Sequence, residues 1–187
     1  VRLVPGRNYT FVAWADQVEA EADEDLYYNT ENLEAVTMMP GTWNAMDESR
    51  DAYTATKLIE NFNSSKDIEL TLKRPFAKLR VVTTDMVALN NLEIVPTTAT
   101  VAYTTKHYTT FNAKAGCAIN KDNSGVEHTY EIVSYGETGA NKTIFTDYFF
   151  AAAEEEVVNF TFDVFDHNGK RIKNNAFTTD IPVKRNH

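Results

Sequence analysis

The sequence predicts an all-β sandwich with long loops and at most one or two short helices, and two observations carry this prediction. The chain is rich in residues that pack well on a pleated sheet, with 23 Thr, 16 Val and 8 Ile among 187 residues and an aromatic content of 12%. Short alternating segments follow one another between turns, which favours a sandwich over βαβ units. The length suits a single domain that spans residues 1–187.

The clearest strand carries apolar residues at every second position and ends in a tight turn. Its apolar residues are Val158, Phe160, Phe162 and Val164. We expect Phe160 and Phe162 in the central core, because one face of such a strand is buried. The turn covers residues 166–169, where an Asn-Gly pair tolerates positive φ. Further strands are predicted at residues 9–15, 68–73, 77–84, 92–103, 130–132, 144–152, 171–173 and 177–183.

Helix and loop signals are fewer. Residues 29–38 could form one short helix with Thr30 as N-cap. The polar stretches 110–127 and 136–142 are predicted to be long exposed loops.

Both ends of the chain look cut. Apolar residues open the chain, and a strand-like run reaches almost to its last residue. Complete domains usually carry a few polar residues outside their terminal elements. We therefore expect the chain to be a segment of a longer precursor, and the alternative is that the strand simply ends there.

The charge of the protein is acidic and local. The net charge is −9, and residues 16–34 hold eight acids and no Lys or Arg. Nucleic acid is excluded as a partner, because a phosphate-binding surface needs clustered cations. The acidic segment is interpreted as a solvated loop or short helix. The alternative, a calcium site, lacks the D-x-D-x-D-G pattern, so we expect no tight calcium binding.

Ion pairing is expected in two places. A cationic cluster, for which we expect partners within the chain or on a neighbouring subunit, comprises Lys73, Arg74, Lys78 and Arg80. Arg50 is surrounded in sequence by acids, and we interpret its segment as a salt-bridged loop that packs Trp43 and Met46. Exposed pairs of this kind contribute on the order of 0–1 kcal/mol each.

No arrangement of residues predicts catalysis, a cofactor or a metal ion. The four histidines, which lie far apart in sequence and are expected on the surface, are His107, His128, His167 and His187. Cys117 is the single cysteine and has no nearby histidine, so it is not a candidate nucleophile. We therefore expect a non-enzymatic protein. No apolar run reaches the ~18 residues of a transmembrane helix.

Several sequence phrases occur together in a recognisable order. The two most specific are residues 74–79, Arg-Pro-Phe-Ala-Lys-Leu, and residues 181–186, Ile-Pro-Val-Lys-Arg-Asn. The others lie at residues 8–16, 25–30, 50–53 and 111–112. In this order and spacing they resemble the fimbrilin-like surface proteins of Bacteroidales, which are related to type V pilus subunits and their accessory proteins.

The resemblance implies a transthyretin-like Greek-key sandwich. It implies export as a lipoprotein to the outer membrane, display at the cell surface, and a structural or adhesive role as a pilus subunit or accessory component. Its partners would be other fimbrilin-type subunits, or a second copy of itself, joined by strand exchange. The signal and the lipidated cysteine of that family do not occur in this chain, and the resemblance supplies no catalytic residues.

The run near the C-terminus is the candidate donor or edge strand. Its alternate residues, which can enter alternate pockets of a neighbour, are Phe177, Thr179, Ile181 and Val183. Pro182 removes one backbone donor, and this suits an edge position.

The alternative function is a glycan-binding module of a surface lipoprotein, with a host or microbial glycan or protein as its partner. Tyr27, Tyr28 and Trp43 are the candidate contacts, because exposed aromatic faces stack on sugars. The competing interpretation is that these rings hold loops against the sandwich. We expect Trp43 to be partly exposed and Trp14 to be mostly buried.

Overall fold

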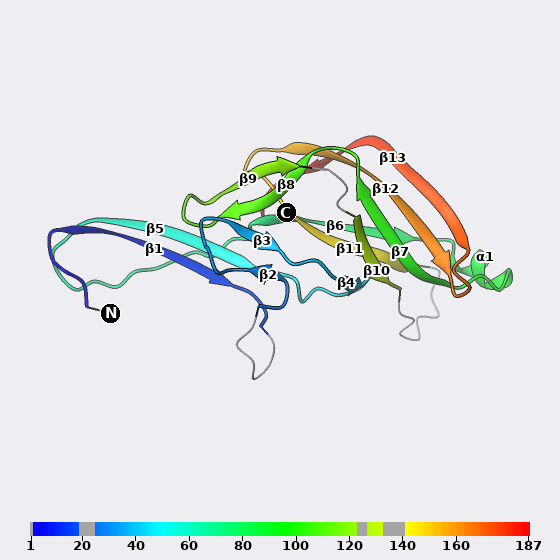
Figure 1. Cartoon of the computed structure of the whole chain (residues 1–187), viewed down its shortest axis with the longest axis horizontal. Coiled ribbons are helices and arrows are strands. Elements are labelled where there is room, and N and C mark those ends of the chain that lie inside the picture. The colour runs from blue at the N-terminus through cyan, green and yellow to red at the C-terminus, as the bar shows by residue number, and fades with distance from the viewer. Residues whose placement is uncertain (1, 19–24, 123–126, 133–140) are drawn as a thin grey trace.

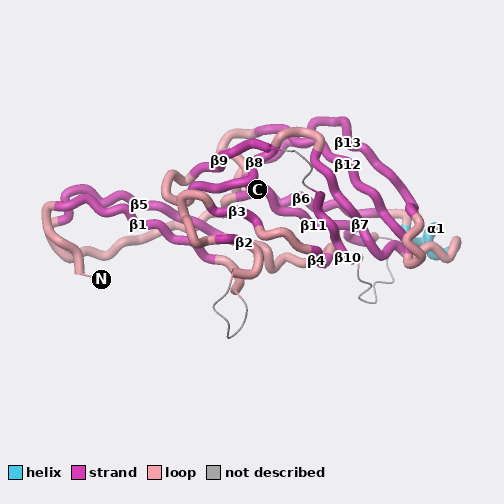
Figure 2. The backbone as a smooth tube through the Cα atoms, viewed as in Figure 1, coloured by secondary structure: helices cyan, strands magenta, loops and turns pink. Residues whose placement is uncertain are grey.

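Strands make up nearly all of the regular structure (Figure 2), which confirms the predicted all-β sandwich. The structure is a computed structural model that describes residues 2–18, 25–122, 127–132 and 141–187. The single helix of the described residues, α1, covers Met86–Asn91. The strands are β1 (Arg7–Ala15), β2 (Tyr28–Asn29), β3 (Val36–Met38), β4 (Thr42–Asn44), β5 (Tyr53–Phe62), β6 (Phe76–Thr83), β7 (Pro96–Tyr103), β8 (His107–Asn112), β9 (Cys117–Asp122), β10 (Glu127–Glu131), β11 (Lys142–Phe150), β12 (Glu156–Asp166) and β13 (Arg171–Val183). No helix of these residues is long and apolar enough to cross a membrane.

Two sheets form the sandwich, and a two-stranded ribbon extends from it (Figure 1). One sheet has the order β13-β12-β7-β10-β4. The other has the order β2-β3-β8-β11-β6, with β9 paired to β8. Among the recorded strand pairs only β10 and β4 are parallel. The ribbon, β1 and β5, lies at the opposite end of the molecule from α1.

The main core lies between the two sheets. Phe160 and Phe162 of β12 are buried there, as the alternation of that strand predicted. Phe145 of β11 packs edge-on against both rings, with centroids 5.7 Å from each. Burying a phenylalanine side chain contributes about 1.5–3 kcal/mol each, so this aromatic layer is a principal source of the sandwich's stability.

A second core lies on the other face of β11, and it joins the ribbon to the sandwich. Tyr148 and Phe150 point to this side, where they meet Tyr28 and Phe111. Trp14 of β1 packs against the Tyr28 ring at 5.5 Å and against the Phe111 ring at 6.4 Å. Trp14 is partly exposed where the ribbon leaves the sandwich, but most of its surface is covered, as expected from the sequence.

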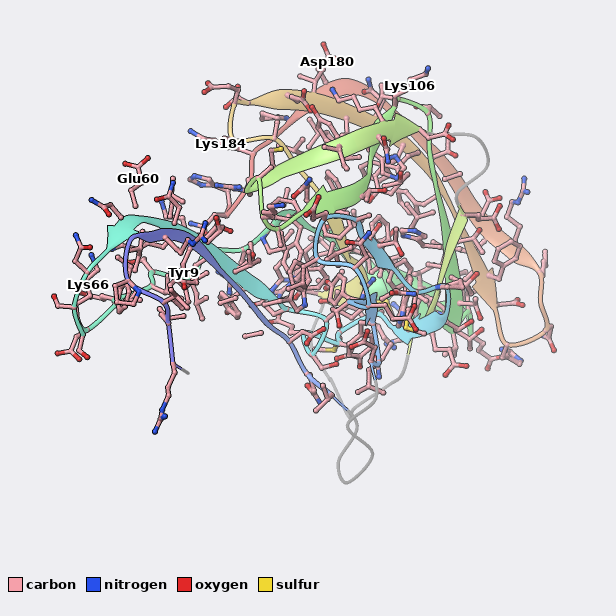
Figure 3. All side chains as sticks on the ribbon, turned by 60° about the vertical axis from the view of Figure 1, so that its left-hand side comes forward. Tyr9, Glu60, Lys66, Lys106, Asp180 and Lys184 are labelled. Atoms are coloured by element: carbon pink, nitrogen blue, oxygen red, sulfur yellow. The ribbon has the colours of Figure 1, made fainter. Side chains whose placement is uncertain are left out.

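The distal part of the ribbon stands clear of the sheets. Figure 3 shows Tyr9, Glu60 and Lys66 on this projecting part. The chain between β5 and β6 turns back along the ribbon (Figure 1). Tyr9 packs edge-on against Phe62 at 6.0 Å, and Ile59 is buried. An isolated two-stranded hairpin is marginally stable in water, so the returning segment supplies part of the cover that the ribbon needs.

Three local predictions are wrong. Residues 29–38 form no helix, because β2 and β3 pair with each other and β3 pairs with β8. The predicted strand at residues 68–73 makes only the bridge between Lys73 and Thr54, because the segment diverges from β5 beyond it. The predicted loop at residues 110–127 contains the β8–β9 hairpin, which the edge of β8 holds despite its polar sequence.

Two other predictions can be placed. The turn at residues 166–169 is confirmed, with the Gly169 N–H donating to the Asp166 carbonyl at 2.9 Å and φ of +73° at Gly169. The predicted loop at residues 136–142 lies almost entirely outside the described residues.

Candidate functional site

A single carboxylate lies in the middle of the aromatic strand β11. Asp147 has no exposed surface, and its side chain shares the inner face of β11 with Phe145 and Phe149. Its Oδ2 accepts a hydrogen bond from the Tyr103 hydroxyl at 2.5 Å and lies 3.0 Å from Nδ1 of His128. Its Oδ1 accepts the Tyr148 N–H at 2.8 Å. A buried carboxylate needs such partners, because burial without them carries a large free-energy cost.

The countercharge of Asp147 comes from the loop between β4 and β5. Arg50 is also fully buried, and its Nη1 lies 3.4 Å from Oδ1 of Asp147. Its Nη2 donates to the Thr146 carbonyl at 2.5 Å. The guanidinium lies over the Trp43 ring, 4.1 Å from the centroid, and such cation–π contacts contribute about 2 kcal/mol when desolvated. The loop is therefore salt-bridged and packs Trp43, as expected from the sequence, but Arg50 pairs with the buried Asp147 rather than with an acid near it in sequence, and Met46 is exposed.

This cluster keeps its charges in the folded protein. Burial alone would raise the pKa of Asp147, but the contacts with His128 and Arg50 outweigh it and hold that pKa well below its usual value. Burial alone would lower the pKa of Arg50, and Asp147 reverses this, so the pKa of Arg50 is raised. Burial and the neighbouring Asp147 raise the pKa of Tyr103 well above its usual value. The cluster is therefore a buried ion pair surrounded by neutral hydroxyls.

Two histidines expected on the surface are buried beside this cluster. His107 and His128 line a cavity of about 340 Å³, together with Trp43, Tyr148 and residues 38–41. The His107 ring packs against Tyr103 at 4.8 Å, and burial followed by the nearby His128 lowers the pKa of His107. The surface prediction is wrong for these two residues, because β4, β7 and β11 bring aromatic rings against them.

The candidate glycan contacts do not form an aromatic platform. Tyr28 is fully buried and donates its hydroxyl to the Arg50 carbonyl at 2.5 Å. Trp43 is only 8% exposed, because its face is covered by Arg50, so the expected partial exposure is wrong. Tyr27 is half-buried, and its hydroxyl contacts Ser49 at 2.5 Å. These rings hold loops against the sandwich, which was the competing interpretation.

The surface cations pair with acids of the β4–β5 loop. Arg74 binds Asp51 at 2.5 Å, and Lys78 and Arg80 both contact Glu48. Partners within the chain were one of the two expectations for this cluster, and Arg74, Lys78 and Arg80 have them.

The acidic segment is described only in part. Its described residue Asp25 accepts hydrogen bonds from the Thr30 N–H and hydroxyl, at 2.7 and 3.0 Å. In the described part of the chain no three His, Cys, Asp or Glu side chains gather as metal ligands.

An apolar groove opens where the two sheets separate near α1. Its volume is about 510 Å³. Apolar residues of five strands line it, and they include Val81, Pro96, Ile144, Phe162 and Ile172. Its two borders, β6 and β13, are the edge strands of the two sheets. We call this feature the edge groove.

The backbone of β6 is only half covered along the edge groove. Asn186 donates to the Phe76 carbonyl at 2.9 Å, and the Lys78 N–H donates to the His187 carbonyl at 3.0 Å. By alternation, the backbone groups of Arg80 and Val82 face the same way. Neither has a backbone partner on that side among the described residues. Asn186 and His187 thus pair with the first part of this edge.

The candidate donor run belongs to the chain's own sheet. Phe177 lies opposite Phe160, Ile181 opposite Val158 and Val183 opposite Glu156, all within β13, and Thr179 lies in the same strand. Ile181 and Val183 pack against the main core. The run is therefore an edge strand in the folded chain, and its use as a donor stays a prediction.

The buried cluster could not be located from sequence spacing. Arg50 and Asp147 lie 97 residues apart. One signal was available: Asp147 is a lone carboxylate in an otherwise apolar, aromatic run, and buried acids are almost always paired. No sequence pattern could have predicted the edge groove, because the groove depends on which strands lie at the sheet edges.

Comparison with known proteins identifies the family of the chain. No curated protein and no solved structure matches it. The sequence profile of DUF6562, a family of unknown function, matches residues 1–187, and the chain therefore belongs to that family.

Proposed function

We propose that this protein is a non-enzymatic structural or adhesion protein of the cell surface, assembled by β-strand addition. The observation that carries the proposal is the edge groove, which combines an apolar lining with an unpaired strand edge on β6. An incoming strand would pair its backbone with Arg80 and Val82 and place alternate side chains in the groove. An edge strand can accept a further strand through its unpaired backbone groups.

The wider proposal follows the resemblance of the sequence phrases to fimbrilin-like proteins. In this wider proposal the fold is a transthyretin-like Greek key. The protein is a lipoprotein that is displayed at the outer membrane as a pilus subunit or accessory component. The buried cluster is a structural part of this proposal, because Arg50 and Asp147 have no surface for a substrate to reach. The edge groove is open to a strand, whereas the aromatic residues considered for glycan binding are largely covered.

The partner in the simplest assembly is a second copy of the chain, which would offer its β13. The test uses a peptide of residues 171–183 and a scrambled peptide of the same composition. A strand that binds only the folded state raises the melting temperature by mass action. We expect a rise with the native peptide and none with the scrambled one.

Two matched variants test whether the peptide binds at the edge groove. Val82, which lines the edge groove and is 45% exposed, is changed to Asp. Leu92, which is 68% exposed and does not line the groove, receives the same change as a control. Val82→Asp should abolish the stabilisation by the peptide, and Leu92→Asp should keep it. The assembly proposal is wrong if the native peptide leaves the melting temperature unchanged and the wild-type chain stays monomeric at every concentration.

A further inference from the structure

A polar hollow lies where β5 leaves the sandwich, and it shares no lining residue with the edge groove. Its volume is about 530 Å³. It is bounded by residues 54–57 of β5, by residues 69–73, by the turn at residues 113–116 and by Arg185. We call it the cationic hollow, because of the charges described next.

The charge of the hollow is opposite to that of the chain. Four cations line it, Lys57, Lys73, Lys114 and Arg185, against the single acid Glu69, in a protein of net charge −9. Only Lys114 has a carboxylate partner among the described residues, Glu34 at 2.6 Å. The Lys57 ammonium contacts only the Glu69 carbonyl at 3.5 Å, and Arg185 donates to the Gly116 carbonyl. Clustered cations of this kind attract an anionic ligand.

The backbone at the hollow is an unpaired strand edge. Thr54 and Lys73 exchange both of their backbone hydrogen bonds, at 2.9 and 3.0 Å. In an antiparallel strand the next residue that faces this edge is Thr56. Its backbone N–H and carbonyl have no partner on that side in the described part of the chain, because residues 69–71 diverge from β5. A donor and an acceptor therefore remain available, as an extended peptide requires.

Two of the four cations, Lys73 and Arg185, lie on one face of this edge. Lys73 shares a sheet face with Thr54, because residues directly opposite each other point to the same side. Thr56 lies on that face too, and its hydroxyl donates to the Ala113 carbonyl. This bond holds the 113–116 turn over the same face, and Arg185 is bound to that turn. A strand that adds here would present every second side chain to the cations.

We propose that the cationic hollow binds an extended acidic peptide, with carboxylates at alternate positions facing Lys73 and Arg185 and with its backbone paired to Thr56. None of the residues that line the hollow is aromatic, so the site is not built to stack a sugar ring. The proposal does not depend on assembly through the edge groove.

The test uses fluorescence anisotropy with the labelled peptide acetyl-Thr-Glu-Thr-Glu-Thr-Glu-Thr-amide and the intact chain. Two control peptides separate the contributions: one has Gln in place of each Glu, and the other has Pro in place of the central Glu. We expect saturable binding of the acidic peptide that weakens as salt is added. Both control peptides should bind about tenfold more weakly or worse, because one lacks the charge and the other lacks a backbone donor.

Two matched charge reversals test the location. Lys73→Glu alters the hollow, whereas Lys106→Glu makes the same charge change at an exposed residue of the sandwich (Figure 3). Lys73→Glu should weaken binding about tenfold or more, and Lys106→Glu less than about twofold. Circular dichroism checks that both variants are folded. Hydrogen exchange of the Thr56 amide should slow when the acidic peptide is added to the wild-type chain.

Four results would overturn the proposal. These are no binding of the acidic peptide, equal binding of the Gln peptide, equal weakening by the two charge reversals, and no protection of the Thr56 amide. Dextran sulfate is the probe for another class of ligand. If it binds at the hollow and the acidic peptide does not, the site is for a sulfated polysaccharide and the peptide proposal is wrong.

Discussion

Replacing Asp147 with Asn tests the buried ion pair directly. The amide keeps the size of the side chain but leaves the Arg50 charge without its counterion, and both side chains are 0% exposed. Removing one partner of a buried pair costs about 3–5 kcal/mol, because the remaining charge stays desolvated. A domain of ordinary stability has about 5–15 kcal/mol in total, so this loss is large. We expect the urea midpoint, followed by circular dichroism, to fall accordingly.

A matched control and a second variant sharpen the test. Glu34→Gln breaks the half-exposed pair with Lys114 and should cost less than about 1 kcal/mol. Arg50→Met combined with Asp147→Asn removes both charges and should cost less than the sum of the two single changes, because their effects couple. The reasoning is refuted if Asp147→Asn costs no more than Glu34→Gln, or if the two core changes add independently.

The same pair predicts how stability depends on pH. The pKa of Asp147 is lowered in the folded protein, whereas an unfolded aspartate titrates near 3.9. Its contribution to stability is therefore complete above about pH 4 and is lost as pH falls below that value. The stability difference between wild type and Asp147→Asn should narrow on acidification from about pH 5 to pH 2. A constant difference over this range would contradict the assignment of an ionised Asp147.

Three further predictions concern the core and the surface. Phe162→Ala should cost about 3–5 kcal/mol, measured by urea unfolding, because it opens a cavity between the sheets; an unchanged midpoint would show that the strand is misplaced. In a Trp14→Phe background the emission of Trp43 should be blue-shifted and little affected by acrylamide, because Trp43 is 8% exposed, and a maximum typical of water would contradict its burial. Isothermal titration should detect no micromolar calcium binding, because the acidic segment lacks the D-x-D-x-D-G pattern of a calcium loop; a tight calcium isotherm would overturn this.

Residues whose environment is set by local pattern were predictable from the sequence. The alternation of β12 placed Phe160 and Phe162 in the core, because one face of such a strand must be buried. The Asn-Gly pair placed the turn after β12, because it tolerates positive φ. The all-β class followed from the abundance of β-branched and aromatic residues. In each case the cause acts within a few residues of the chain.

The tertiary structure alone decided which residues meet across the sandwich. His107 and His128 become buried partly because Phe149 and Trp43, which lie far from them in sequence, pack against their rings. The β8–β9 hairpin forms in a polar stretch because the edge of β8 supplies backbone partners, and these do not depend on side-chain type. Residues 68–73 alternate well but make one bridge to β5, because residues 69–71 diverge from that strand, so local alternation did not by itself produce a strand.

The two candidate sites could not be predicted from the sequence for the same reason. The edge groove exists because β6 and β13 lie at the edges of different sheets, which is a property of strand order. The cationic hollow exists because residues 69–71 diverge from β5 and the turn after β8 folds over the gap. The fold class and the core strand could be predicted from the amino-acid sequence, because both depend on local composition and periodicity. Strand order and the pairing of Arg50 with Asp147 were decided only by long-range packing, which brings residues 97 positions apart into contact.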